Sequence, residues 1–246
     1  MSRIQRPSRS RLTDVGFLRA ASVEVVGLLP YASNYTFLAR LSDGENKELV
    51  VYKPTRGERP LWDFPHGTLA AREAAAYLVS EGAGWGIVPP TVLRTDAPLG
   101  GGSFQLFIEH DPELHYFTLS ETRLDEFEVF AAFDVVTNNA DRKAGHVLQD
   151  AKGKLWAVDH GLTFNVEEKL RTVIWEFADR PIGDAVRANL QELLDALESD
   201  GEIRRGLAEL LMAEETRALI ARTKLLLRLG VYPQPGGHRP YPWPLV

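Results

Sequence analysis

The sequence predicts an α+β fold in two parts, an antiparallel β-sheet with one helix first and a mainly helical part after it. Three observations support this prediction. Residues 23–54 contain three short strand patterns separated by turns, residues 69–81 have a helical pattern, and apolar residues recur at helical spacing in several stretches of residues 124–229. The chain has 246 residues, enough for one large domain or for two small lobes around a cleft.

The composition excludes several classes of protein. Hydrophobic residues make up 44% and charged residues 25% of the chain, so it can build a core. Cysteine is absent, which excludes disulfides and thiolate chemistry and agrees with a reducing cytoplasm. A formal net charge of −6 gives no general attraction to nucleic acid or anionic membranes. No apolar run approaches the roughly 20 residues that span a bilayer, so we expect no stable membrane insertion.

The first lobe is expected over residues 13–110. Before it, residues 1–12 form a basic arm that we expect to be disordered, and no apolar segment follows the arm as it would in a signal peptide. Residues 15–26 predict a short helix and a strand, and alternating apolar residues at 35–41 predict a second strand. Asp43-Gly44 predicts a hairpin turn, and a third strand ends at Pro54.

The helix at residues 69–81 carries an acid where an apolar residue is expected. Thr68 is its predicted N-cap and Gly82 its predicted end. Glu73 lies four residues after Leu69 and four before Tyr77, on the helix face that these two side chains would bury. A buried carboxylate needs a cationic partner, or its pKa rises and it becomes neutral. Lys53, at the end of the third strand, is the candidate partner.

The remaining elements follow from turn residues and helical periodicity. Residues 91–94 and 103–110 predict two strands around a glycine-rich tip, and the second strand ends where a hinge between lobes would lie. The second lobe is expected over residues 111–230, and a proline-rich tail over residues 231–246 either packs on the surface or is loose. In the second lobe we expect helices at 124–136, 185–197, 202–211 and 214–229, a hairpin at 147–158, and an irregular segment at 165–181 with Trp175 and Phe177 in the core.

The most informative stretch is residues 138–148, followed by an acid at position 159. Asp141 lies in a polar loop beside Arg142, and Asp159 lies at the tip of a strand just before Gly161. Two carboxylates on neighbouring loops can position a hydroxyl and a metal-bound phosphate. In this interpretation Asp141 accepts or orients the hydroxyl proton and Asp159 holds a divalent cation. His146 lies five residues after Asp141, where a second metal-side residue is expected.

Each of these residues also has a purely structural explanation. Asp141 could cap a turn, Asp159 could begin one, and His146 could be a hydrogen-bonded loop histidine. Lys53 could be a solvated charge at the end of a strand. Their order favours a common site instead, since a strand lysine, a helix glutamate, Asp-x-x-x-x-His and Asp-x-Gly follow one another along the chain.

These loops resemble those of a known superfamily. Residues 138–142 (NNADR) and 157–164 (AVDHGLTF) resemble the catalytic and metal-binding loops of phosphatidylinositol 3-/4-kinase-like proteins, most closely an actinobacterial branch and more distantly HipA-type Ser/Thr kinases. Residues 32–36 (ASNYT) and 51–54 (VYKP) are similar to that branch as well. The resemblance covers about residues 28–229 and implies a two-lobed kinase-like fold that uses ATP with Mg²⁺ or Mn²⁺.

The resemblance also implies a role for each matching residue. Lys53 would contact the nucleotide phosphates, Glu73 would brace it, Asp141 would be the catalytic aspartate and Asp159 the metal ligand. Ser33 and Asn34 would lie in the phosphate-facing turn. At the hinge, the backbone at Glu109 and His110 would bind the adenine edge.

The sequence departs from the superfamily in three ways. His146 replaces the usual Asn, and imidazole suits Mn²⁺ better than Mg²⁺. The turn at residues 30–36 has no glycine, which restricts backbone approach to phosphate. Arg171 and Arg180 are isolated in the sequence, so no basic cluster is available for an inositol phosphate.

We therefore expect an ATP-dependent phosphotransferase acting on a hydroxyl of a protein or a small molecule rather than on an inositol lipid. The alternative is an ATP-binding pseudokinase that serves as an interaction or regulatory module. A non-catalytic scaffold that binds partners through its proline-rich tail would require Lys53, Glu73, Asp141 and Asp159 to be coincidental.

Overall fold

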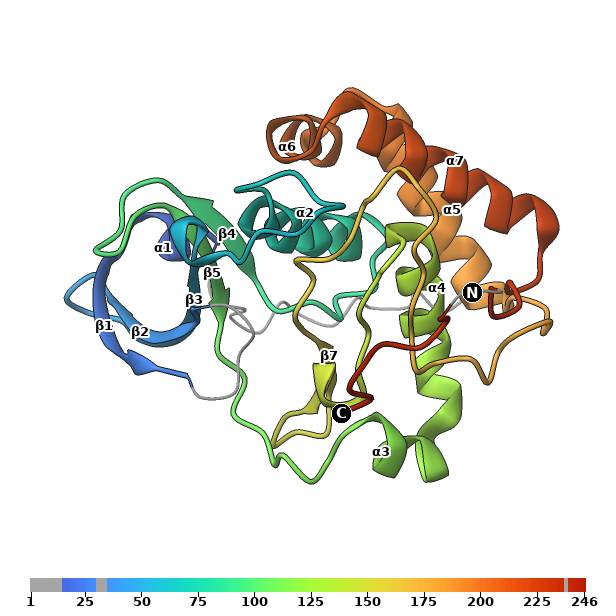
Figure 1. Ribbon diagram of the computed structural model, residues 1–246, viewed down its shortest axis with the longest axis horizontal. Coiled ribbons are helices and arrows are strands. Elements are labelled where there is room, and N and C mark those ends of the chain that lie inside the picture. Colours follow the sequence, from blue (N-terminus) through green and yellow to red (C-terminus); the bar gives the residue numbers. More distant parts are fainter. Residues whose placement is uncertain (1–14, 30–34, 237–238) are drawn as a thin grey trace, which may run out of the picture.

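The computed structural model describes residues 15–29, 35–236 and 239–246. The basic arm and the predicted phosphate-facing residues Ser33 and Asn34 lie outside the described residues. Figure 1 shows an antiparallel sheet on the left and a mainly helical part on the right. The predicted two-lobed α+β class is therefore confirmed. Within the described ranges, no helix is both long enough and apolar enough to cross a bilayer.

The N-terminal lobe is built on a five-stranded antiparallel sheet in the order β1-β2-β3-β5-β4. Its elements are α1 (Val15–Ala20), β1 (Ser22–Leu28), β2 (Phe37–Ser42), β3 (Lys47–Pro54), α2 (Leu69–Gly82), β4 (Thr91–Arg94) and β5 (Gly102–Leu106). The predicted hairpin turn is present, since Asp43 Oδ1 accepts hydrogen bonds from the backbone N–H groups of Glu45 (3.0 Å) and Asn46 (2.7 Å). Tyr52 and Phe104 stack in the core of the lobe with ring centroids 4.3 Å apart.

The predicted strand at residues 103–110 is shorter in the structure. β5 ends at Leu106, although the N–H of Phe107 still donates to the carbonyl of Leu49 at 2.9 Å. Beyond that point the chain leaves the sheet and crosses to the second lobe. Phe107 and Ile108 are apolar because they line the cavity between the lobes, not because they continue the sheet.

Helix α2 has the predicted limits and the predicted N-cap residue, Thr68, but another side chain makes the capping hydrogen bond. The hydroxyl of Thr68 donates to the carbonyl of Pro65 at 2.7 Å and does not cap the helix. The carboxylate of Glu58 instead accepts a hydrogen bond from the N–H of Ala70 at 3.0 Å. An acid near a helix N-terminus satisfies a free donor and complements the helix dipole. The predicted cap position is therefore correct, but the sequence did not identify the capping acid, because Glu58 lies ten residues before Thr68, outside the usual cap position.

The C-terminal lobe contains one helix more than was predicted. Its elements are α3 (Tyr116–Arg123), α4 (Glu128–Thr137), β6 (Val147–Gln149), β7 (Leu155–Ala157), α5 (Asp184–Glu198), α6 (Glu202–Leu210) and α7 (Ala213–Leu229). Helix α3 buries only Tyr116 and Leu119, too sparse an apolar pattern to identify it. The predicted helix at 124–136 begins at Glu128, because a 3₁₀ turn (Leu124–Phe127) precedes it. The predicted hairpin and the last three helices are confirmed.

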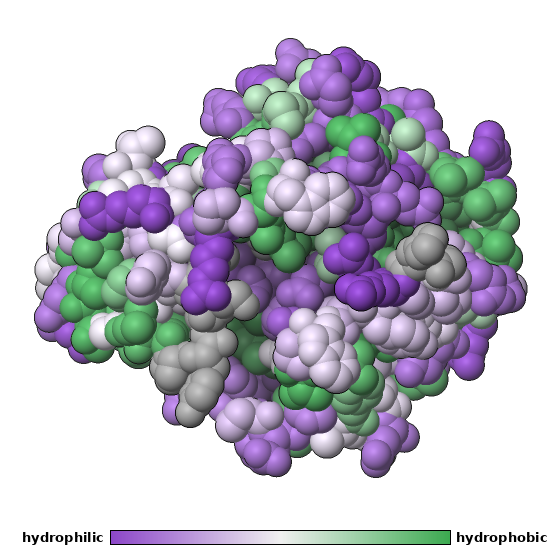
Figure 2. Space-filling model, in the orientation of Figure 1, coloured by the Kyte–Doolittle hydropathy of each residue, from purple (hydrophilic) through white to green (hydrophobic). Residues whose placement is uncertain are grey.

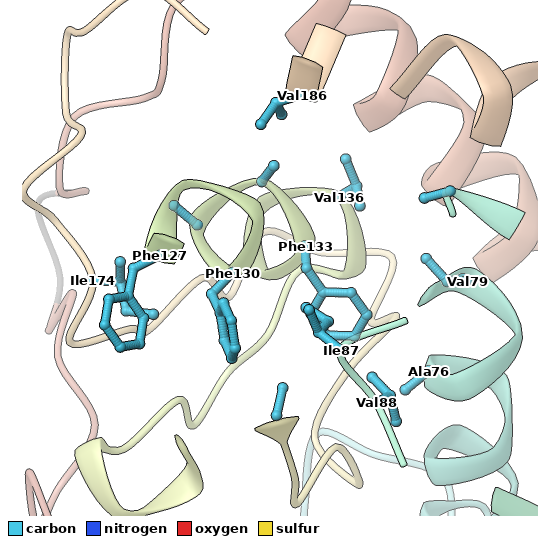
Figure 3. Close-up of a cluster of buried hydrophobic side chains, with 14 of the residues drawn as sticks. Ala76, Val79, Ile87, Val88, Phe127, Phe130, Phe133, Val136, Ile174 and Val186 are labelled. Carbon is cyan, nitrogen blue, oxygen red and sulfur yellow. The ribbon is translucent and has the colours of Figure 1, made fainter. Parts of the chain in front are cut away.

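Helix α4 passes through the centre of the second core. Figure 3 shows Phe130 and Phe133 projecting from α4, with Val79, from α2, and Ile87 on the side toward α2. All four side chains are buried. The helix ends at Thr137, and the C-cap residue Asn138, with a φ of +52°, turns the chain into the loop that carries Asp141. Asn is among the few residues that adopt this left-handed conformation readily.

The described part of the proline-rich tail packs on the second lobe rather than hanging loose. The carbonyl of Pro240 accepts hydrogen bonds from the N–H of Thr172 (3.0 Å) and from Trp175 Nε1 (3.2 Å). The carbonyl of Leu245 accepts from the N–H of Ala144 at 2.7 Å. In Figure 1 the end of the tail accordingly lies beside β7. The tail thus reaches the loop that follows Asp141.

Candidate active site

A cavity of about 640 Å³ lies between the two lobes. This volume is within the range of small-molecule sites, about 300–1,000 Å³. Figure 2 shows a hollow near the centre of the face in view, with hydrophilic side chains inside it. Of the residues predicted from the sequence, the cavity wall contains Lys53, Glu73, His110, Asp141, His146 and Asp159.

Lys53 forms the centre of a three-residue ion cluster. Its Nζ donates to Glu73 Oε1 and, at 2.7 Å, to Asp159 Oδ1. The second oxygen of Glu73 accepts a hydrogen bond from the N–H of His160 at 2.9 Å. Burial lowers the pKa of Lys53, but the charges of Asp159 and Glu73 raise it more, so the amine stays protonated. The buried acid of α2 therefore has the partner that its position predicted.

Asp141 is held in the loop between α4 and β6. Its N–H donates to Asn139 Oδ1 at 3.0 Å, which fixes the backbone. Its side chain is 27% exposed, and Lys143 Nζ lies 3.4 Å from Oδ2. Burial raises the pKa of Asp141 to about 6, although Lys143 opposes the shift. A carboxylate with this pKa is mostly ionised at pH 7 and can accept a proton there.

His146 and Asp159 face each other across the same wall. His146 Nε2 lies 3.4 Å from Asp159 Oδ2. Burial lowers the pKa of His146 to about 4, so the ring is neutral at pH 7 and keeps a nitrogen lone pair. Burial also raises the pKa of Asp159, but Lys53 and His146 lower it more, and the carboxyl stays ionised. Asp159 has a φ of +60°, a left-handed conformation that is more often found at functional sites.

The donor atoms of this wall fit a nucleotide-bound cation better than a free one. Among the residues that the structure describes, no group of three or more His, Asp and Glu side chains could hold a metal. Asp159 and His146 supply one oxygen and one nitrogen. Mg²⁺ sites in nucleotide enzymes commonly use one or two protein ligands together with phosphate oxygens and water. The pair thus fits a metal that arrives with nucleotide phosphates.

Arg142, the basic residue beside Asp141, connects the two loops, although it was not among the predicted site residues. The fully buried guanidinium donates to Asp134 Oδ1 from Nε (3.0 Å) and Nη2 (2.9 Å). Its Nη1 donates to the carbonyl of Val158 at 3.1 Å, and Nη2 lies 2.9 Å from His160 Nε2. One side chain therefore fixes the loop of Asp141 against the loop of Asp159. The signal was present in Asp134, an acid inside an apolar helix that needs a cation just as Glu73 does.

A second buried arginine fixes α2 to the C-terminal lobe. Arg72 donates from Nη1 to the carbonyl of Thr163 and from Nη2 to Glu215 Oε1 of α7. Its guanidinium also lies over the ring of Phe64, 5.0 Å from the centroid. Because Arg72 directly precedes Glu73, these contacts hold the Lys53 partner in position.

Three further cavity residues have no counterpart among the predicted site residues. Lys143 and Arg171 line the cavity next to Asp141, and Trp243 reaches it from the tail. Arg171 was expected to be isolated, but the fold brings it beside the loop of Asp141, because the N–H of Arg171 donates to the carbonyl of Asn139 at 2.8 Å. Sequence separation hid this proximity, since residues 166–175 and the tail are irregular segments without periodicity.

Of the two predicted hinge residues, one lines the cavity and the other does not. His110 lines the cavity, and its Nδ1 lies 2.8 Å from the carbonyl of Ile108. Glu109 is exposed and is not part of the cavity wall. Leu106, Phe107 and Ile108, just before the predicted hinge residues, also line the cavity.

Solved structures that are similar to this chain include two kinases and a Fam20 protein. Hydra Fam20 with sugar has a TM-score of 0.55 and 15% identity, and the match covers 87% of this chain and 86% of that one. The *Helicobacter pylori* proinflammatory kinase CtkA has a TM-score of 0.54 and 11% identity, covering 87% and 94%. The Golgi casein kinase with Mn and ADP bound has a TM-score of 0.52 and 13% identity, covering 87% and 74%. The fold is therefore kinase-like.

Protein Rv2133c of *Mycobacterium tuberculosis* (strain ATCC 25618 / H37Rv) is 40% identical over 262 aligned residues, which cover 92% of this chain and 93% of that protein. The chain belongs to the Rv2133c family. No protein-family model matches the chain. The similarity to Rv2133c extends over nearly the whole chain, and the similarity to the solved structures shows its fold. The narrower resemblance to an actinobacterial branch of phosphatidylinositol 3-/4-kinase-like proteins stays a prediction.

Proposed function

We propose that the protein is an ATP-dependent phosphotransferase that moves the γ-phosphoryl group to a hydroxyl of a protein or small molecule. One observation carries the proposal. Lys53 joins Glu73 and Asp159 on the wall of a cavity that also contains Asp141. Phosphoryl transfer needs cations at the phosphates and a carboxylate at the attacking hydroxyl, and this cavity contains both.

In the proposed reaction, ATP occupies the cavity with its base at the hinge and its phosphates toward Lys53. Asp159 and His146 would hold Mg²⁺ or Mn²⁺, and the metal would supply positive charge at the phosphates. Asp141 accepts the proton as the acceptor oxygen forms its bond to the γ-phosphorus. The bond from that phosphorus to the β–γ bridging oxygen breaks, and ADP leaves with the electron pair. Asp141 then releases the proton to solvent.

Two further observations support the cofactors and the location. The Golgi casein kinase structure holds Mn and ADP, and its fold is shared by this chain. His146 contributes an imidazole, a ligand type that suits Mn²⁺ better than Mg²⁺. We also propose a cytoplasmic location, with which the absence of cysteine agrees.

The proposal is tested with purified protein, ATP, and Mg²⁺ or Mn²⁺ in separate reactions. We expect metal-dependent thermal stabilisation by ATP, worth about 2.7 kcal/mol at a hundredfold excess over Kd. We also expect transfer of labelled phosphate to the protein itself or to an added acceptor. Asp141→Ala should abolish transfer and retain ATP binding, whereas Asp159→Ala should lose the metal dependence of binding.

The pseudokinase alternative has two observations in its favour, the His146 imidazole beside Asp159 and the absence of glycine from residues 30–36. It predicts ATP-dependent stabilisation without transfer under any metal. A melting temperature that ATP and metal leave unchanged would refute both functions.

A further inference from the structure

Arg171 is a cation of the cavity wall whose positive charge acts on the carboxylate of Asp141. Lys53 is bound by two carboxylates and Lys143 by one. In residues 15–29, 35–236 and 239–246, by contrast, the Arg171 side chain has neither a hydrogen bond nor an ion pair, although it lines the cavity. A guanidinium is always charged and offers a planar fork of donors, which matches carboxylate and phosphate oxygens. Arg171 is therefore available to bind an anion from outside the chain.

The backbone of Arg171 is rigidly placed relative to Asp141. Its N–H donates to Asn139 at 2.8 Å, and its carbonyl accepts from the N–H of Arg142 at 3.0 Å. The next residue, Thr172, is fixed through its hydroxyl to Asp134 Oδ2 at 3.0 Å. Preorganisation of this kind lowers the entropy lost when a ligand binds. The backbone of Arg171 is thus held in a fixed position beside the loop that carries Asp141, the proposed base.

Trp243 extends the same wall from the tail. Its side chain is 87% exposed yet lines the cavity. The tail is anchored on both sides of it, by Pro240 to Trp175 at 3.2 Å and by Leu245 to Ala144 at 2.7 Å. A tryptophan carries a large apolar face, and an anchored one left in water can cover the body of a ligand.

We propose that Arg171 and Trp243 form the acceptor-binding part of the cavity and select an alcohol that carries a carboxylate or phosphate close to its hydroxyl. This inference rests on the proposed phosphoryl transfer. Arg171 would bind the anionic group and Trp243 would cover the body of the acceptor. The hydroxyl then points to Asp141, whose own negative charge would otherwise repel an anionic substrate. The same chemistry occurs in small phosphate esters and in acidic peptides.

The test compares acceptors that differ only in charge. Glycerol and glycerol 3-phosphate form one pair, and a serine peptide with neighbouring alanines or neighbouring aspartates forms the other. The variants are Arg171→Glu and Trp243→Ala. Their matched controls are Arg180→Glu, an exposed arginine of the same segment outside the cavity wall, and Trp62→Ala, a 91% exposed tryptophan outside it.

The wild type should favour the anionic member of at least one pair, and the preferred pair identifies the source of the anion. Arg171→Glu should raise KM for that acceptor by roughly 10- to 100-fold, because one charge-assisted hydrogen-bonded contact is lost. It should leave KM for ATP unchanged. Trp243→Ala should raise KM for both members several-fold. Both controls should match the wild type.

Calorimetry is used to measure the binding of glycerol 3-phosphate and of the acidic peptide in the absence of ATP. This measurement separates the inference from the proposed function. Binding that Arg171→Glu abolishes supports the acceptor site even if no phosphate is transferred, and only the phosphotransferase proposal would then fail. Equal use of neutral and anionic acceptors would overturn the acceptor site and leave the transferase standing. An Arg171→Glu effect on KM for ATP alone would also overturn it, since the arginine would then serve the nucleotide.

Discussion

Asp141→Asn should inactivate the protein and stabilise it at the same time. Burial raises the pKa of Asp141 from 3.8 to about 6, so the folded protein binds this proton more tightly than the unfolded chain does. The ionised carboxylate therefore destabilises the fold as the pH rises from about 4 to about 6. A shift of about 2 units corresponds to about 3 kcal/mol at pH 7. For a chain of this size that equals about 6–12 °C in Tm. A neutral Asn removes the penalty but cannot act as a base.

The assay is urea unfolding of the wild type and the variant at pH 7 and at pH 3.5. The variant should be more stable at pH 7, and the difference should nearly vanish at pH 3.5, where Asp141 is protonated in both states. Wild-type transfer activity should fall about tenfold per pH unit below pH 6. Asp159→Asn is the control of opposite sign, because the pKa of Asp159 lies below its ordinary value and its charge stabilises the fold. An Asp141→Asn variant less stable than the wild type at pH 7 would refute the reasoning.

Three other substitutions test the surrounding network. Lys53→Met should destabilise the protein by about 3 kcal/mol, because Glu73 is left buried without a cation. Adding Glu73→Gln should restore the stability measured by urea unfolding but should not restore phosphate transfer. A double variant that recovers no stability would contradict the pairing. His146→Asn should raise the ratio of Mg²⁺-supported to Mn²⁺-supported initial rates several-fold, and an unchanged ratio would remove His146 from the metal site. Arg72→Met should lower the free energy of unfolding by about 3–5 kcal/mol, and combining it with Glu215→Gln should cost less than the sum of the single changes; additivity would exclude coupling.

Local patterns were sufficient for much of the fold and for part of the site. The strands, the hairpins and helices α2, α5, α6 and α7 follow from periodicity and turn residues that act within a few positions. The partnership of Lys53 with Glu73 followed from one physical requirement, that a carboxylate on a buried helix face must be compensated. The same requirement, applied to Asp134, leads to Arg142, which is its partner in the structure.

The remainder depends on tertiary contacts that leave no local pattern. Glu58 caps α2 from outside the usual cap position, and helix α3 buries too few residues to show a period. Arg171 and Trp243 reach the cavity only because backbone hydrogen bonds join two irregular segments to the loop of Asp141. Such contacts follow from how the lobes and the tail pack, not from residue spacing.

The attachment of α2 determines which part of the molecule can move. Arg72 joins it to Glu215 of α7, Glu73 joins it to the N–H of His160, and Gly82 lies close to Ile203 of α6. An opening of the cleft that keeps these buried contacts must carry α2 along with the C-terminal lobe. The sheet then moves relative to α2, and among the ion pairs of the described residues those of Lys53 with Glu73 and Asp159 join the sheet to the parts that stay behind. Under the proposed function, release of the nucleotide and separation of Lys53 from Glu73 would then be a single event.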